Sequence, residues 1–447
     1  MKKIIIVSMI AALLFCLFLS PAMGAEYYNS KLDNADAKAY MTVNADYSQT
    51  IFAKNENEQL PCTSLTKIMT MIVAAEKIKD FNKSVTVTQN EIDELANTNA
   101  YTFGLNAGDN IYIIDLMYLT LLNSANDAAI VLANAASGST EQFVSDMNAK
   151  ASELGCSQTQ FTDPTGISDN DVSSASDLIK ISEEFMSDSL LSKISSTYEY
   201  SLVSPGIDVD DRQITNDFRM VDTDSTNYYY RYASGIKNGY SEAAKSCACI
   251  TATKNGYTYY TVILGCEPDD TGYSGASLTL GENMFDWVFD NIELRVVADP
   301  NQYIAEAKVK LSSETDYVAA VPAKQVMALL LKTVDESSLT YDAKIDDDLK
   351  APIHKGDKIG TATVKFADED IAQIDLVASD DIKANVFLSI GYGIKTIVTS
   401  SYFIAGVVVL FLLIISAVFV RSVRSKQKIK SLNSDKKDKP GERDRRN

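Results

Sequence analysis

The chain has 447 residues, of which 46% are hydrophobic, and a formal net charge of −19 at pH 7. At roughly 150 residues per domain, this length predicts two or three domains with ordinary hydrophobic cores. The negative charge argues against nucleic acid as a partner, because nucleic acid requires a basic surface.

The N-terminus has the parts of a secretory signal. A pair of lysines precedes an apolar stretch, residues 4–19, and small residues follow it up to Gly24. We predict cleavage after Gly24, so that residues 1–24 form a signal peptide. A lipoprotein modified at Cys16 is the alternative, but bulky Phe15 precedes it where a lipobox carries a small residue.

The first predicted elements are two short strands, residues 39–43 and 50–53, which flank a polar turn and form a hairpin. An apolar helix over residues 68–75 follows. Ser64 and Lys67 stand at the head of this helix, and their spacing of three places both side chains on one helical face. The free N–H groups of a helix N-terminus can also stabilise a developing oxyanion.

A serine hydroxyl becomes an effective nucleophile when a neighbouring base takes its proton. The only histidine, His354, lies far downstream in a segment rich in Lys, Gly and Asp, so a Ser-His-Asp triad is not expected. A lysine kept neutral by desolvation and by nearby positive charge can act as the base instead. The alternative interpretation of Ser64 and Lys67 is a surface Ser-x-x-Lys sequence that occurs by chance.

Two further apolar helices are predicted at residues 111–122 and 127–136. The short polar gap between them presents a hydroxyl from Ser124 and an amide from Asn126. Helix capping by either side chain is the alternative explanation for these two residues.

A Lys-Asn-Gly sequence at residues 237–239 lies in a predicted strand, where the glycine would allow a backbone or a ligand to approach closely. Strands at residues 246–253 and 257–266 follow, joined by an Asn-Gly turn that is typical of a hairpin. A helix at residues 282–292 closes the first domain, which we place at residues 25–293.

The alternating pattern of residues 294–390 predicts a small all-β domain. We find no group of potential catalytic residues in this region. A linker is expected at residues 391–396. Residues 397–420 are an uninterrupted apolar run long enough to span a bilayer. The basic residues of 421–447 place this tail in the cytoplasm by the positive-inside rule and the catalytic domain outside the cell. A buried core helix, the alternative, fits poorly with such a tail.

Five cysteines remain after cleavage, and an odd number cannot pair completely within one exported chain. We interpret them mostly as small apolar residues and leave their disulfide state open. The chain has no Cys-x-x-Cys pair and no cluster of histidines, so a metal site is not expected. We expect no cofactor. These cysteines are Cys62, Cys156, Cys247, Cys249 and Cys266.

The chain contains three short motifs in this order: Ser64-x-x-Lys67, Ser124-x-Asn126 and Lys237-x-Gly239. They resemble the active-site motifs of penicillin-recognising serine enzymes. Their local sequences resemble D-alanyl-D-alanine carboxypeptidases, the low-molecular-mass penicillin-binding proteins. The resemblance covers about residues 35–385, since residues 351–359 are similar to the C-terminal β-domain of that group. It implies an α+β fold: a β-lactamase/transpeptidase-like domain with an antiparallel sheet flanked by helices, then a small all-β domain and a C-terminal transmembrane helix.

The resemblance implies a catalytic role for three residues. Ser64 would attack the carbonyl of the penultimate D-alanine, Lys67 would be its base and later activate water, and Ser124 would relay a proton to the leaving nitrogen. An oxyanion hole would form from the N–H of Ser64 and an N–H of the strand that carries Lys237.

The same resemblance implies a substrate-binding role for four residues. Asn126 would bind the peptide, and Lys237 would keep Lys67 neutral and attract the substrate carboxylate. Asn238 and Gly239 complete the third motif. The family carries Thr or Ser where this chain has Asn238, and the usual hydroxyl donates to the terminal carboxylate.

A second departure from the family pattern is an absent arginine. Family members carry one after this strand to hold the carboxylate, whereas residues 233–293 contain none. Loss of a hydrogen bond to a charged group costs roughly 1.5–3 kcal/mol. The two departures put recognition of the terminal carboxylate in question. A milder third departure is the full membrane span in place of the amphipathic anchor of some relatives.

We therefore expect a single-pass membrane carboxypeptidase that removes D-alanine from peptidoglycan stem peptides and is acylated by β-lactams at Ser64. A β-lactamase is one alternative, but the loop at residues 161–170 offers only Asp163 and Asp169 where a glutamate would be expected for deacylation. A weakened enzyme that binds the wall or senses β-lactams is the other alternative, and Asn238 and the missing arginine motivate it.

Overall fold

The computed structural model describes residues 36–434, except positions 97, 206, 208–211, 269–274 and 367–368, and it describes side chains up to residue 426, except at positions 336 and 369. The predicted signal peptide and the end of the basic tail lie outside this range. The chain forms two compact units. The first comprises the described residues up to Val297, together with Val326–Thr340 and Val364–Ala372.

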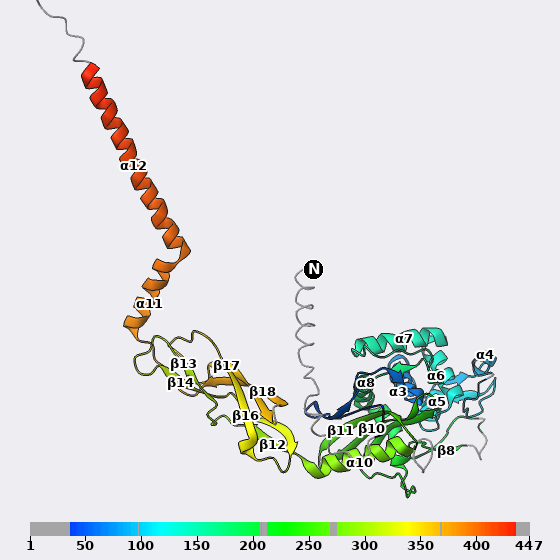
Figure 1. Cartoon of the computed structure of the whole chain (residues 1–447). Helices are drawn as coiled ribbons and strands as arrows, with labels where there is room; N and C mark the ends of the chain where they lie inside the picture. The colour runs from blue at the N-terminus through cyan, green and yellow to red at the C-terminus, as the bar shows by residue number, and fades with distance from the viewer. Residues whose placement is uncertain are drawn as a thin grey trace, which may run out of the picture. The chain divides into compact units, whose positions relative to one another are not determined.

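A five-stranded antiparallel sheet is the centre of the first unit, in the order β2-β1-β11-β10-β9 (Figure 1). Both predicted hairpins are present, since β1 pairs with β2 and β10 pairs with β11. The strands are β1 (Ala39–Asn44), β2 (Gln49–Lys54), β9 (Ala233–Ser241), β10 (Lys245–Lys254) and β11 (Tyr257–Cys266).

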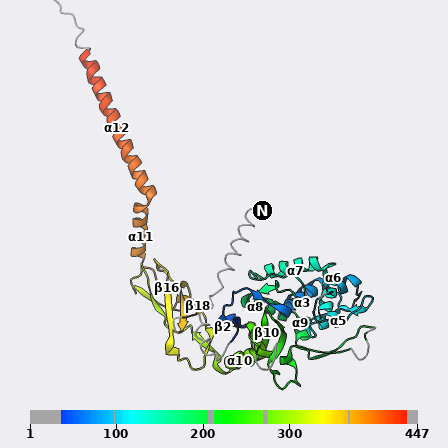
Figure 2. The same ribbon diagram turned by 45° about the vertical axis from the view of Figure 1, so that its right-hand side comes forward.

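Helices cover both faces of this sheet, as the two views in Figures 1 and 2 show. Helix α10 packs on β10 and β11 on one side, and α8 packs on the other. Gly281 of α10 allows the close approach, because a Cβ there would lie 2.3 Å from Ile250 Cδ1. The helices are α3 (Thr66–Lys77), α5 (Ile113–Leu121), α6 (Asn126–Ser137), α7 (Thr140–Glu153), α8 (Ala175–Ser187), α9 (Ser189–Ser195) and α10 (Gly275–Asn291).

Short elements connect these layers, and most of them are too brief to be recognised from sequence. They are β3 (Leu60–Pro61), η2 (Thr63–Leu65), β4 (Ser84–Thr86), α4 (Gln89–Asp93), β5 (Asn110–Tyr112), β6 (Val172–Ser173), β7 (Glu199–Ser201), β8 (Gln213–Thr215) and η4 (Arg219–Val221).

Helix α3 lies in the middle of the helical layer and contacts α5, α6, α7 and α8. Its apolar side chains from Ile68 to Ala74 are at most 3% exposed. Full burial of such a side chain contributes roughly 1.5–3 kcal/mol each relative to exposure. This packing fixes the helix, and with it the short turn η2 that precedes it.

A small all-β domain follows, as predicted, but its last strand ends at Ala378, and residues 386–390 of the predicted range 294–390 already belong to a helix. Its five-stranded sheet has the order β13-β14-β18-β17-β16, and a separate pair joins β12 to β15. The strands are β12 (Ile292–Ala298), β13 (Ala305–Lys308), β14 (Tyr317–Pro322), β15 (Val326–Leu331), β16 (Leu339–Ile345), β17 (Lys358–Phe366) and β18 (Glu369–Ala378), with the short helix η5 (Glu336–Ser338).

Two consecutive helices, α11 (Val386–Thr399) and α12 (Ser401–Ser434), follow the β-domain. The expected linker at residues 391–396 is therefore helical. Asn385 caps α11, since its side chain accepts from two N–H groups of the first turn. The segment Ser401–Lys426 is long and apolar enough to cross a membrane, and it starts later than the predicted span at residues 397–420.

Candidate active site

Ser64 lies in the turn η2, directly before α3, and is half-buried. Its hydroxyl accepts a hydrogen bond from Ser124 Oγ at 3.3 Å. The backbone N–H of Ser64 donates to Thr63 Oγ1. The structure thus brings the serines of the first two motifs into direct contact, although 60 residues separate them in sequence.

Two glycines enclose this turn from different segments. A Cβ at Gly239 in β9 would lie 2.7 Å from Thr63 Oγ1 and 3.1 Å from Ser64 N. A Cβ at Gly166, whose φ is +74°, would lie 1.9 Å from the Thr63 carbonyl oxygen. The close approach predicted for Gly239 is therefore present, and the approaching group is the turn that carries Ser64.

Lys67 is fully buried at the start of α3. Its Nζ donates to Asn126 Oδ1 at 2.7 Å and to the Thr165 carbonyl at 2.6 Å. No hydrogen bond joins Ser64 to Lys67 among the described residues, although the spacing suggested one, because the Lys67 amine is directed to Asn126 and Thr165. Burial, together with the charge of Lys237, lowers the pKa of Lys67 to about 7.

Ser124 occupies the gap between α5 and α6 in a left-handed conformation, with φ +57°. The N-cap residue of α6 is Ala125, and the side chains of Ser124 and Asn126 bond other segments, so helix capping does not explain this motif. Asn126 donates from Nδ2 to the Tyr101 carbonyl at 2.8 Å while it accepts from Lys67. Each polar group of its amide thereby has one partner in the protein and can still form a second hydrogen bond.

Lys237 projects from β9 and is 1% exposed. Its Nζ donates to the Leu121 carbonyl, at the end of α5, over 2.7 Å. Burial lowers the pKa of Lys237 to about 8, and the opposing influence is the negative charge of Asp217. Lys67 and Lys237 are thus both buried, and desolvation lowers the pKa of each.

Asn238 follows Lys237 in the terminal strand of the sheet and pairs in register with Ala248 of β10. The residue is 7% exposed. Its Oδ1 is buried and has no hydrogen-bond partner among the described residues. Such an unpaired acceptor is unusual, because buried polar atoms are nearly always bonded.

Asp127 is a supporting residue that sequence reasoning missed. It is 2% exposed and accepts from the backbone N–H groups of Phe103, Gly104 and Leu105 at 2.9–3.0 Å. These bonds fix the loop whose Tyr101 carbonyl accepts from Asn126. The only sequence signal was an acidic residue directly after the second motif.

Asp163 has a comparable supporting role in the loop at residues 161–170. It accepts from the N–H groups of Thr165, Gly166 and Ser168. These bonds shape the turn from which the Thr165 carbonyl reaches Lys67. Nearby Asp171 is buried, and desolvation raises its pKa to about 6, with the charge of Asp163 as the second cause.

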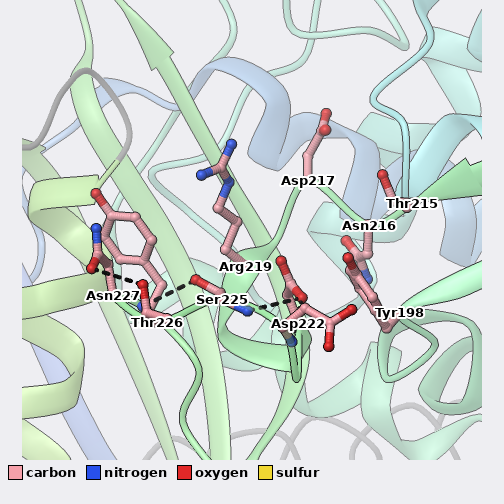
Figure 3. Close-up of a pocket in the computed structure, with 11 residues that line it drawn as sticks. Tyr198, Thr215, Asn216, Asp217, Arg219, Asp222, Ser225, Thr226 and Asn227 are labelled. Atoms are coloured by element: carbon pink, nitrogen blue, oxygen red, sulfur yellow. Dashed lines mark hydrogen bonds between the residues drawn. The ribbon is translucent and has the colours of Figure 1, made fainter.

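A polar cavity of about 420 Å³ lies beside η4 (Figure 3). Its lining includes Asp217, whose N–H donates to the Leu122 carbonyl at 2.8 Å. Asp217 therefore lies next to the carbonyl that Lys237 uses. The other lining residues are Tyr198, Thr215, Asn216, Arg219, Asp222, Asp224, Ser225, Thr226, Asn227 and Tyr228.

The described part of the chain contains no group of three or more His, Cys, Asp or Glu side chains that could hold a metal ion. Its five cysteines are free and buried. Burial raises the pKa of Cys247 and Cys249 to about 12, and it raises the pKa of Cys62 as well. The thiols therefore behave as small apolar groups, as expected.

The α+β fold and the paired serines beside a buried lysine define a serine hydrolase of the penicillin-binding type. The chain belongs to the D-alanyl-D-alanine carboxypeptidase family (Peptidase S11), whose model matches residues 26–268. A second model, the C-terminal domain of penicillin-binding protein 5, matches residues 293–384.

Individual proteins agree with this assignment. The chain is 28% identical over 356 residues to the D-alanyl-D-alanine carboxypeptidase DacF of Bacillus subtilis, covering 79% of this chain and 88% of that protein. It is 22% identical to DacC of Escherichia coli over 83% of this chain and 91% of that one.

Solved structures show the same fold. The carboxypeptidase DacD from Francisella tularensis superposes with a TM-score of 0.62 at 19% identity, covering 79% of this chain and 95% of the other. Penicillin-binding protein 5 from Haemophilus influenzae gives 0.58 at 22% identity, with 79% and 99% covered.

Proposed function

We propose that this protein is a membrane-anchored serine D-alanyl-D-alanine carboxypeptidase that trims peptidoglycan stem peptides through an acyl-enzyme on Ser64. The observation that supports it most is the contact of Ser64 with Ser124 beside a buried lysine whose pKa is lowered to about 7. A base with a pKa near the working pH combines availability of the neutral form with sufficient basicity.

In the proposed reaction, Ser64 Oγ attacks the carbonyl of the penultimate D-alanine while Lys67 takes the hydroxyl proton. Ser124 passes a proton to the leaving D-alanine nitrogen, which is consistent with its hydrogen bond to Ser64 Oγ. Water activated by Lys67 then hydrolyses the ester. Since the neutral amine is the active form, burial and the charge of Lys237 both favour catalysis.

The remaining site residues are proposed to bind substrate and transition state. Asn126 would contact the peptide, and Lys237 would supply positive charge near the leaving residue. The N–H of Ser64, which donates to Thr63 Oγ1 in this structure, would turn to the oxyanion and form the hole together with an N–H of β9 next to Gly239. Their proximity is supported by the tight approach of the two segments, since a Cβ added at Gly239 would lie 3.1 Å from Ser64 N.

Penicillins are proposed to acylate the same serine. The β-lactamase alternative is weakened by Asp163, because its oxygens already accept three backbone N–H groups of their own loop. The alternative of a weakened wall-binding or β-lactam-sensing protein is favoured by Asn238 and by the absent arginine.

We propose that α12 crosses the cell membrane once, with the catalytic domain at residues 25–293 and the β-domain at 294–390 on the exported side. The basic residues of 421–447 would then lie in the cytoplasm. The apolar segment Ser401–Lys426 supports this arrangement.

The test uses the full-length chain in detergent with a labelled penicillin and with a diacetyl-lysyl-D-alanyl-D-alanine peptide. Mass spectrometry should find one penicillin adduct, on the peptide that holds Ser64, and Ser64→Ala should remove it. Release of D-alanine should require the same serine. An adduct on another residue would refute the assignment, and release of the bound β-lactam within minutes would favour the β-lactamase alternative.

A further inference from the structure

Helix α11 (Val386–Thr399) leaves a contiguous row of large apolar side chains exposed. At 3.6 residues per turn, six of them fall within about 120° of one another around the helix axis. Their exposed fractions run from 47% to 87%. A soluble surface rarely presents such a patch without a partner. The six residues are Val386, Phe387, Ile390, Ile394, Ile397 and Val398.

The β-domain holds the far side of the same helix. Lys350 Nζ lies 4.8 Å from the centre of the Tyr392 ring. At the head of the helix, the Asn385 N–H donates to the Leu311 carbonyl at 2.7 Å. Tyr392 lies away from the exposed row around the helix axis, beside Ser389, whose Oγ is buried. The apolar row therefore faces away from the domain to which the helix is attached.

The sequence separates α11 from α12 (Figures 1 and 2). Ser400 has an extended backbone, with φ −67° and ψ +142°, and ends α11. Its Oγ then accepts from the Phe403 N–H at 3.2 Å, which caps α12. Asn385 caps α11 in the same way. Since each helix has its own N-terminal cap, the break between them is encoded locally.

The length of α12 shows that a membrane span needs no residue of α11. Apolar residues 402–420 rise about 28 Å as a helix, which matches the roughly 30 Å of a bilayer core. A single straight helix that also included residues 386–399 would be about 52 Å long and would exceed that core. Helix α11 thus begins where the bilayer core ends, and lipid is the apolar material next to it.

The composition of α11 also suits a lipid surface. It contains no acidic residue, and its one charged residue is Lys395. Helices with an apolar face and a polar face lie in the plane of the membrane, with the apolar side chains about 5–10 Å into the boundary between head groups and acyl chains.

We infer that α11 lies in the membrane interface with its apolar row in the lipid, and that it fixes which side of the β-domain faces the bilayer. The inference rests on the proposed span of α12. That span alone retains the protein in the membrane but leaves the β-domain free to turn about the junction at Ser400. An interfacial helix bound to the domain through Tyr392 and Asn385 removes this freedom.

The first experiment uses the full-length chain in phosphatidylcholine and phosphatidylglycerol vesicles. The five described cysteines are buried, so a polarity-sensitive thiol dye can be directed to an introduced cysteine, with the parent protein as the labelling blank. Ile394→Cys reports on the apolar row, and Thr396→Cys is the matched site on another face. A nitroxide lipid labelled near the head group should quench the dye at 394 at least about three-fold more than at 396, and aqueous iodide should show the reverse order.

Three results would overturn the inference. Equal access of iodide to both sites would place α11 in water. Protection of site 394 from both quenchers would mean that protein, such as a second copy of the chain, covers the row. Stronger quenching at both sites by a nitroxide at the end of the acyl chain would place α11 inside the span. Release of the protein by alkaline carbonate would instead refute the proposed span itself.

A second experiment tests the effect on the β-domain. A dye at Asp348→Cys, beside Lys350, should transfer energy to acceptors on the lipid head groups. Joint replacement Phe387→Glu and Ile394→Glu should lower this transfer while the protein stays in the membrane. Thr396→Glu, which adds charge outside the apolar row, should leave it unchanged. Equal transfer in all three proteins would show that α11 does not orient the domain.

Discussion

Buried charged residues around the active site of the first unit contrast with an exposed ion cluster in the second unit. In the first unit, Lys67, Lys237 and Asp127 are at most 2% exposed, and each bonds groups from distant segments. In the second unit, Asp348 pairs with Lys310 and Lys350, and all three side chains are 33–54% exposed.

This difference decides what a mutation should do. Removal of one partner from a buried pair leaves a charge or a polar group without water, which is strongly unfavourable. In an exposed pair, water replaces the lost partner, and the pair itself contributes little. Perturbations of the first unit should therefore change catalysis and stability, and equivalent perturbations of the second should change neither.

Lys67→Arg should give the largest effect. Arginine keeps its proton at every accessible pH, so it cannot act as the base. We expect the rate of penicillin acylation to fall by about 10²- to 10⁴-fold, the usual contribution of general base catalysis. The matched change Lys310→Arg in the exposed pair should leave the rate within about two-fold of wild type. A Lys67→Arg enzyme with normal rate would exclude this lysine as the base.

The pH dependence of acylation should follow the two lysines. The neutral form of Lys67 is the active one, and its pKa is about 7, so the rate should rise with pH up to that value. Lys237 must keep its proton, and its pKa is about 8, so the rate should fall at higher pH. Below the first pKa the rate should drop about ten-fold per pH unit.

Asp217→Asn sharpens this test. The charge of Asp217 raises the pKa of both lysines, so its removal should move both limbs of the profile to lower pH. Stopped-flow measurement of acylation from about pH 5 to about pH 10 would cover both titrations and show the shift. A profile with unchanged limbs would mean that other groups control the rate. Replacing Asp348, in the exposed pair, should not move the profile.

Asp127→Asn should reduce stability. The carboxylate accepts three backbone N–H groups of one loop, and an amide can accept with only one of its two ends. We expect the free energy of unfolding to fall by about 1–3 kcal/mol, measured by denaturant titration. The control Asp348→Asn should show no measurable change, and an equal loss in both variants would contradict the comparison of the two units.

Cys62→Ser should have the smallest effect in the first unit. The thiol is fully buried and contacts Thr66 Oγ1 and the Asp171 carbonyl at 3.4–3.5 Å, which a hydroxyl can also do. Burial raises the pKa of Cys62 and keeps it protonated. Penicillin acylation should stay within about three-fold of wild type, and complete loss of labelling would mean either that Ser64 is not the nucleophile or that Cys62 has a structural role.

The sequence predicts the parts of this site whose signals are local. Both hairpins, the helices after Ser64 and around Ser124, and the order of the three motifs were visible from periodicity and turn residues. Prediction of a helix or strand from a long apolar segment is reliable because many residues contribute to the periodic pattern.

The remaining features depend on contacts between distant segments. The spacing of Ser64 and Lys67 indicated a direct contact, but packing against Asn126 and Thr165 directs the amine elsewhere. The role of Asp127 comes from a loop more than 20 residues away, as its bond to the Phe103 N–H illustrates. Helix α11 covers the end of the predicted β-domain, the whole predicted linker and the start of the predicted span, so the sequence did not identify it as one element.

The two glycines that enclose Thr63 have a consequence for evolution under antibiotic selection. Every base change at the first or second position of a glycine codon replaces the glycine, and Gly166 and Gly239 have no room for a Cβ beside the nucleophile's turn. An amino-acid substitution at either glycine is therefore expected to disturb the fold around the nucleophile. Variants that change the reaction with β-lactams, and still fold, must arise at neighbouring codons such as that of Asn238, where the side chain already departs from the family pattern.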